Sequence, residues 1–170
     1  MSDGYERGDF DRAVSLVSAD PSPRALVERL GIDWEYLSWL ARDASAAVLA
    51  EQEELRGEVV SNAGEAFTAG FLIAVHLGGE PRAAPEWLGA AVDLVQVRGR
   101  HAVIADHCDL ASVARLETVY SDALVESMEI EGSERDALRS PVTRVFEAGL
   151  AVGLGVASGG DGTGPDTQQP

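Results

Sequence analysis

The sequence predicts an all-α protein, a compact bundle of about six helices. Apolar residues recur at helical spacing through most of the chain, whereas the alternation typical of strands is confined to one short segment. Helix caps and breakers divide the periodic segments into lengths usual for globular helices. The 170 residues, 45% of them hydrophobic, suffice for one hydrophobic core. We therefore expect a single helical domain over residues 1–157, followed by a flexible Gly- and Pro-rich tail over 158–170.

The first half of the chain contains four predicted helices. Apolar residues at helical spacing predict a helix over 10–19, and the breaker SADPSP separates it from a short helix over 24–30. Asp33 caps a longer amphipathic helix that ends near residue 56. Asn62, with Glu65 three residues later, forms a capping box for the next helix, which ends at GGEPRAAPE.

The second half begins with an ambiguous segment. Residues 86–97 satisfy a helical pattern, which we favour, but alternating valines and a Gly between two arginines also fit a β-hairpin near 92–105. Beyond it, Asp109 caps a helix that runs to about Met128. Ser140 and Pro141 then supply an N-cap and a first helical residue for the last helix.

Two apolar passages resemble each other. When Phe67 is aligned with Phe146, each passage shows a Phe followed by small residues every fourth position, which in a helix form a small-residue stripe along one side. The aligned residues are Phe67, Gly70, Ala74 and Gly78 in the first passage, and Phe146, Gly149, Gly153 and Ala157 in the second. Such stripes let backbones approach closely, either within the chain or between two copies in a homodimer. A longer amphipathic helix precedes each passage, so two related helical hairpins are predicted, with chance similarity as the alternative.

The charge is strongly acidic. There are 29 acidic residues against 13 basic ones, all of them Arg, which gives a net charge of −16. This balance is typical of proteins that stay soluble in molar salt. The acidic N-terminus lacks the features of a signal peptide, one cysteine permits no intrachain disulfide, and the apolar passages are too short to span a membrane. These observations predict a cytoplasmic protein without membrane contact.

Residues 24–43 have the spacing of a helix-turn-helix, with Gly31 in the turn, and resemble that DNA-binding motif. The second helix would present Trp34, Ser38, Trp39 and Arg42 to nucleic acid. However, apart from Arg42, it carries none of the Arg, Lys, Asn or Gln side chains that favour base reading. Ordinary helix packing is the alternative, with the two tryptophans in the core or against a partner.

Residues 98–109 gather Arg98, Arg100, His101, His107 and Cys108. The arginines and His101 could bind an anion, whereas His107 and Cys108 could belong to a metal or thiol site. A structural zinc site needs four firm ligands at paired spacings, and no second pair exists. The sequence therefore predicts no metal and no cofactor.

No established catalytic motif is present, so no catalytic residue is assigned. The sequence favours a non-catalytic binding protein, acting as an adaptor, assembly or regulatory subunit through a protein partner or self-association. The alternatives are a helix-turn-helix transcriptional regulator that binds nucleic acid, and a small enzyme with its site at 101–109.

Overall fold

The computed structural model describes residues 4–20, 22–49, 58–81, 85–127 and 133–159. Within these ranges the chain forms eight α-helices and a short 3-10 helix, with no β-strand. The helices are α1 Arg7–Ser18, α2 Pro23–Arg29, α3 Trp34–Leu49, α4 Glu58–His76, η2 Pro85–Trp87, α5 Leu88–Arg98, α6 Arg100–His107, α7 Leu110–Ser127 and α8 Ser133–Gly159. The all-α prediction is confirmed, although the described helices outnumber the six expected.

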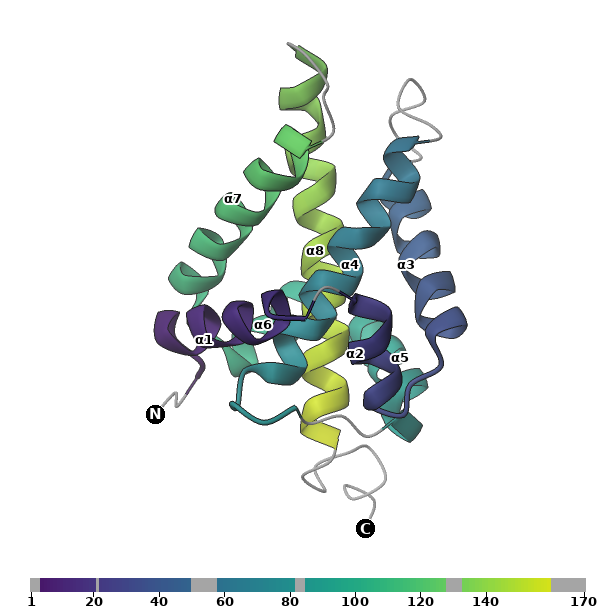
Figure 1. The fold of residues 1–170 in the computed structure, drawn as a ribbon, viewed down its shortest axis with the longest axis vertical. Helices are drawn as coiled ribbons and strands as arrows, with labels where there is room; N and C mark the ends of the chain where they lie inside the picture. The colour runs from purple at the N-terminus through teal and green to yellow at the C-terminus, as the bar shows by residue number, and fades with distance from the viewer. Residues whose placement is uncertain (1–3, 21, 50–57, 82–84, 128–132, 160–170) are drawn as a thin grey trace.

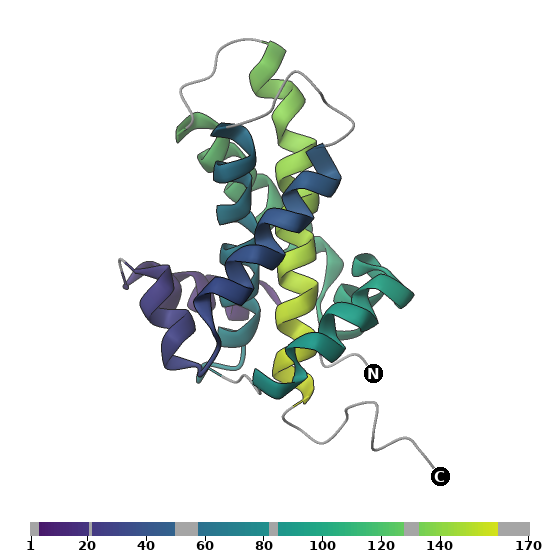
Figure 2. The same ribbon diagram turned by 90° about the vertical axis from the view of Figure 1, so that its right-hand side faces the viewer.

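Helices α4 and α8 form the centre of the protein. They run side by side through the whole molecule, with α3 and α7 on opposite sides of their upper half (Figure 1). The lower half is enclosed by α1 and α2 on one side and by α5 and α6 on the other (Figure 2). Both central helices carry long buried apolar runs, because neighbours cover them on several sides.

Two of the predicted helix starts are confirmed by their caps. Asp33 precedes α3, and its carboxylate accepts a hydrogen bond from the Glu35 amide at 3.1 Å. Asp109 precedes α7, and its carboxylate accepts from the Ser112 amide at 3.0 Å. Short polar side chains at these positions satisfy amides that have no partner inside the helix.

The β-hairpin considered near 92–105 is wrong, because this segment folds as α5 and α6 with a turn at Gly99. Gly99 has a φ of 89°, a conformation that L side chains rarely adopt and that here ends one helix and begins the next. Val103 and Ile104 are buried where α6 packs against α8. Burial against α8 therefore makes this segment helical, although its β-branched residues fit a helix or a strand.

Two predicted helix starts are wrong. Asn62 lies inside α4, which begins one turn earlier at Glu58 in a segment without a helix breaker. Pro141 lies inside α8, which begins at Ser133. A proline inside a helix removes one backbone hydrogen bond, but Val142 and Val145 beside it are fully buried, and this packing compensates for the loss.

The helices pair in the order that the sequence suggests. α3 packs against α4, α7 packs against α8, and the two pairs meet through α4 and α8. A common ancestry of the two pairs stays a prediction. The predicted end of the third helix near residue 56, and most of the predicted tail, lie outside the described residues. In the part of the chain that the structure describes, no helix is long and apolar enough to cross a membrane.

Candidate functional site

The small-residue stripes of α4 and α8 face each other. A Cβ atom added to Gly70 would lie 2.4 Å from the carbonyl oxygen of Phe146, and one added to Gly149 would lie 2.0 Å from that of Phe67. Side-chain atoms do not approach backbone oxygens so closely, so each helix occupies the space that a side chain on the other would need. The stripes are covered within one chain, and a homodimer would need another surface.

The contact extends along α8 but stops before the end of the first stripe. A Cβ on Gly153 would lie 2.7 Å from the Ala74 Cβ, whereas Gly78 lies beyond the end of α4 and is exposed. Ala157 is half-buried in the last turns of α8. Gly155, which the stripe pattern does not include, faces α5, where an added Cβ would lie 2.9 Å from the Ala91 Cβ.

A cavity of about 940 Å³ lies between α3 and α4, and α1, α2 and α7 also contribute to its wall; we call it the α3–α4 cavity. Apolar and aromatic side chains form much of its wall. They are Val17, Trp34, Ala41, Ala69, Leu72 and Tyr120. Its volume lies within the range of sites for small organic molecules, which are also mostly apolar with a few polar groups.

The residues predicted to contact DNA divide between this cavity and the outer surface. Trp34, Ser38 and Arg42, at helical spacing on α3, line the cavity. Trp39 is 57% exposed and stacks on Tyr36, with the ring centroids 6.3 Å apart. The interpretation of Trp39 as a core residue is therefore wrong, because the face of α3 that packs on α4 is formed by other residues of the helix.

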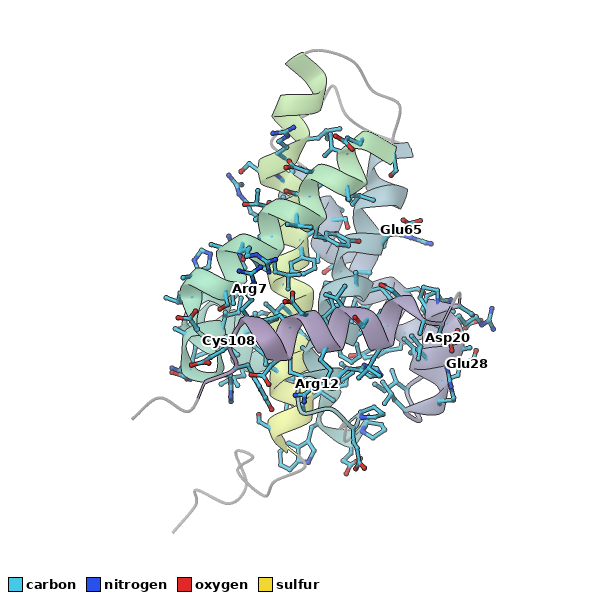
Figure 3. All side chains as sticks on the ribbon, turned by 60° about the vertical axis from the view of Figure 1, so that its left-hand side comes forward. Arg7, Arg12, Asp20, Glu28, Glu65 and Cys108 are labelled. Carbon is cyan, nitrogen blue, oxygen red and sulfur yellow. The ribbon has the colours of Figure 1, made fainter. Side chains whose placement is uncertain are left out.

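The polar groups at the cavity differ in their partners. Arg24 forms an ion pair with Glu28 at 2.7 Å, and Thr68 donates a hydrogen bond to the Gly64 carbonyl. Among the described residues, Arg42 has no ion-pair partner. Glu65 contributes a carboxylate from α4, above the corner between α1 and α2 (Figure 3). Within the described part of the chain, a ligand could therefore use Arg42 without breaking an ion pair.

The residues gathered at 98–108 in the sequence do not form one site. Arg98 pairs with Asp106 at the surface. Arg100 and His101 instead contact Glu147 of α8: Arg100 Nε lies 3.1 Å from Oε1, and His101 Nε2 lies 3.0 Å from Oε2. The predicted anion ligands thus bind a carboxylate of the chain itself.

Glu117 of α7 lines the same cavity as these three residues, and we call Arg100, His101, Glu117 and Glu147 the carboxyl cluster. Glu147 is only 8% exposed. Burial, and after it the negative charge of Glu147, raises the pKa of Glu117 to about 8. At neutral pH Glu117 is therefore mostly protonated. This polar cavity has a volume of about 460 Å³.

His107 and Cys108 lie apart from the carboxyl cluster. Cys108 is buried next to the N-terminal segment (Figure 3). There the backbone amide of Tyr5 donates to the His107 carbonyl, and the Tyr5 carbonyl accepts from the Asp109 amide, both at 2.8 Å. Burial raises the pKa of the Cys108 thiol to about 12, so the thiol is protonated and unreactive at neutral pH. Burial also lowers the pKa of His107. Among the residues described, no group of His, Cys, Asp and Glu has the geometry to hold a metal ion.

Sequence reasoning missed Glu117 and Glu147. Both occur in amphipathic helices where acidic residues are common, and nothing in their local spacing distinguishes them from solvated carboxylates. One signal was available: Glu147 lies between Phe146 and Gly149, in the passage expected to be buried. An ionisable residue in such a passage needs a partner.

The comparisons with known proteins return nothing: no family model, no curated protein and no solved structure matches this chain.

Proposed function

We propose that this protein is a non-catalytic regulatory subunit that binds a small amphipathic anion in the α3–α4 cavity. The observation that carries the proposal is the placement of Arg42 and Ser38, one turn apart on α3, in the wall of a mostly apolar cavity. The guanidinium and hydroxyl groups supply donors for a carboxylate or similar anionic group. The apolar wall suits a hydrocarbon or aromatic body.

The same placement favours a cavity ligand over nucleic acid. In a DNA-reading helix, the residues that contact bases project from the protein surface into the major groove. Here Trp34, Ser38 and Arg42 lie in the wall of a cavity shared with α4. The exposed Tyr36–Trp39 pair would then contact a protein partner of such a subunit, because aromatic residues are enriched at protein interfaces.

The binding proposal is tested with anilinonaphthalenesulfonate, a fluorescent anion with an apolar aromatic body. We expect saturable binding to the folded protein. Arg42→Gln should weaken it about ten-fold, because a charge-assisted hydrogen bond is lost. Ala69→Phe should abolish it by filling the cavity. Fluorescence titration in molar KCl gives the dissociation constants.

Matched controls separate the cavity from the general surface. Arg7→Gln removes an exposed arginine of α1, and Ala47→Phe adds an aromatic side chain to the exposed face of α3. Both should bind the dye as the wild type does. Equal binding by wild type, Arg42→Gln and Ala69→Phe, or no saturable binding by the wild type, would exclude the cavity as the site. Cooperative unfolding of each variant shows that the dye reports on a folded protein.

We also propose that the protein works in the cytoplasm of a cell with high internal salt. The net charge of −16 is the supporting observation. Like charges on one small protein repel one another, molar salt screens this repulsion, and salts that are excluded from protein surfaces strengthen apolar burial.

Thermal stability should therefore rise with salt. We expect a higher unfolding midpoint in 3 M KCl than in 0.1 M KCl, measured by circular dichroism at the same pH. An unchanged or lower midpoint would contradict the proposed adaptation to salt.

A further inference from the structure

Two opposite charges border the α3–α4 cavity at the same level. Gly64 of α4 packs against α3, since a Cβ added to it would lie 3.9 Å from the Ala41 Cβ and 4.0 Å from the Ser45 Oγ. Arg42 directly follows Ala41 in α3, and it lines the cavity. Glu65 directly follows Gly64 in α4, and it lines the same cavity. A guanidinium and a carboxylate therefore approach one level of the cavity from its two facing helices.

Neither of these charges is neutralised within the described part of the chain. No ion pair among the described residues includes the Arg42 guanidinium or the Glu65 carboxylate. By contrast, Arg24, which also lines the cavity, pairs with Glu28 at 2.7 Å. Arg42 and Glu65 are both exposed, which places them on the open side of the cavity. They are thus accessible to two groups of opposite charge on one ligand.

The cavity wall next to the Glu65 carboxylate is apolar. Ala69 and Leu72 follow Glu65 at one-turn intervals on α4, and both line the cavity. Tyr120 of α7 adds an aromatic ring to this side. Its hydroxyl donates to the Glu65 carbonyl at 3.4 Å, and its ring packs on Phe146 with the centroids 4.7 Å apart, so two contacts fix its position. A large apolar group that enters here leaves the charged end of its molecule on the open side.

We propose that the ligand of the α3–α4 cavity is an α-amino acid with a large apolar side chain, whose carboxylate contacts Arg42 and whose ammonium group contacts Glu65. This inference rests on the proposed function and adds a positive group to the anionic ligand. An α-amino acid carries both charged groups on one carbon atom, which suits opposite charges at one level of the cavity. Molar salt screens charges that lie apart, but direct contacts between ions and hydrogen-bonding groups persist.

Three ligands with the same indole ring test the two contacts separately. Tryptophan carries both charged groups, indole-3-propionate lacks the ammonium group, and tryptamine lacks the carboxylate. Wild type should bind tryptophan about ten-fold more tightly than either of the others, because each of these lacks one charge-assisted hydrogen bond. Equilibrium dialysis in molar KCl gives the dissociation constants, since at this salt concentration the protein's charge does not redistribute a charged ligand across the membrane.

Substitutions at the two charges should affect different ligands. Arg42→Gln should weaken the binding of tryptophan and indole-3-propionate about ten-fold and leave that of tryptamine unchanged. Glu65→Gln should weaken the binding of tryptophan and tryptamine about ten-fold and leave that of indole-3-propionate unchanged. The controls are Arg7→Gln in α1 and Glu126→Gln in α7, which replace exposed charges outside the cavity wall and should bind all three ligands as the wild type does. Cooperative unfolding of each variant shows that it is folded.

The outcomes separate this inference from the proposed function. If indole-3-propionate binds in an Arg42-dependent way and tryptophan binds no more tightly, the cavity takes an anion and the amino-acid inference is wrong. If Glu65→Gln weakens indole-3-propionate as much as tryptophan, Glu65 shapes the cavity without contacting an ammonium group, and the inference is also wrong. If the wild type binds neither the indole ligands nor anilinonaphthalenesulfonate, the proposed function is wrong and the inference fails with it.

Discussion

Gly149→Ala is expected to destabilise the protein more than the same substitution at any other described glycine. The added Cβ would lie 2.0 Å from the Phe67 carbonyl oxygen and 2.8 Å from its Cα, so α4 and α8 must move apart. Overpacking costs about 1–3 kcal/mol when side chains can adjust. A backbone oxygen cannot rotate away, so we expect a loss of about 3 kcal/mol or more, a large fraction of the stability of a small domain. Denaturant unfolding in molar KCl measures it.

The chain contains its own controls for this prediction. Gly89 in α5 and Gly8 in α1 are helical glycines, and a Cβ added to either would meet no atom within 4 Å. Alanine favours a helix by up to about 1 kcal/mol over glycine, so Gly89→Ala and Gly8→Ala should be neutral or stabilising. If Gly149→Ala behaves as these variants do, the close approach of α4 and α8 does not exist.

The effects of larger side chains should be non-additive. Gly70→Leu and Gly149→Leu each separate the same two helices, so the second substitution acts on a contact that the first has already opened. We therefore expect the double variant to lose less stability than the two single losses added together.

Glu117→Gln is expected to stabilise the protein at neutral and alkaline pH. Below pH 4.5, the ordinary pKa of this carboxyl group, it is protonated in both the folded and unfolded states. Between pH 4.5 and about 8 the unfolded chain releases the proton while the folded protein keeps it, so wild-type stability falls as pH rises. Glutamine does not titrate, so the stability of Glu117→Gln does not fall in this way as pH rises.

The full pKa shift overstates the gain because Glu117 is only half-buried, and solvent screens part of its interaction. We expect the stability difference between Glu117→Gln and wild type to grow by about 1–2 kcal/mol from pH 4 to pH 8. Unfolding curves across that range measure the difference, with Glu126→Gln as the control. A difference that stays constant with pH would show that Glu117 titrates normally in the folded protein.

The sequence predicted the fold class because that information is local. Apolar periodicity marks helices without reference to the rest of the chain, and caps such as Asp33 and Asp109 act within one turn. The errors occurred where distant residues decide. Val95 and Val103 fit a strand or a helix equally well, and only packing on α8 selects the helix.

The candidate sites were less predictable for the same reason. Arg100 and His101 were singled out as anion ligands, but their partner lies more than 45 residues away in the sequence, at Glu147. The α3–α4 cavity draws residues from five helices. Neither arrangement can be recognised from the spacing of residues along the sequence, because each depends on how distant helices pack together.

The central position of α8 also affects how the chain is made. Ribosomes release a chain from its N-terminus, so α8 is synthesised after the seven other described helices, and most of these pack against it. Until it emerges, the glycine-containing face of α4 has no neighbour to cover it. The nascent chain therefore exposes the apolar surface of α4 until translation has passed α8.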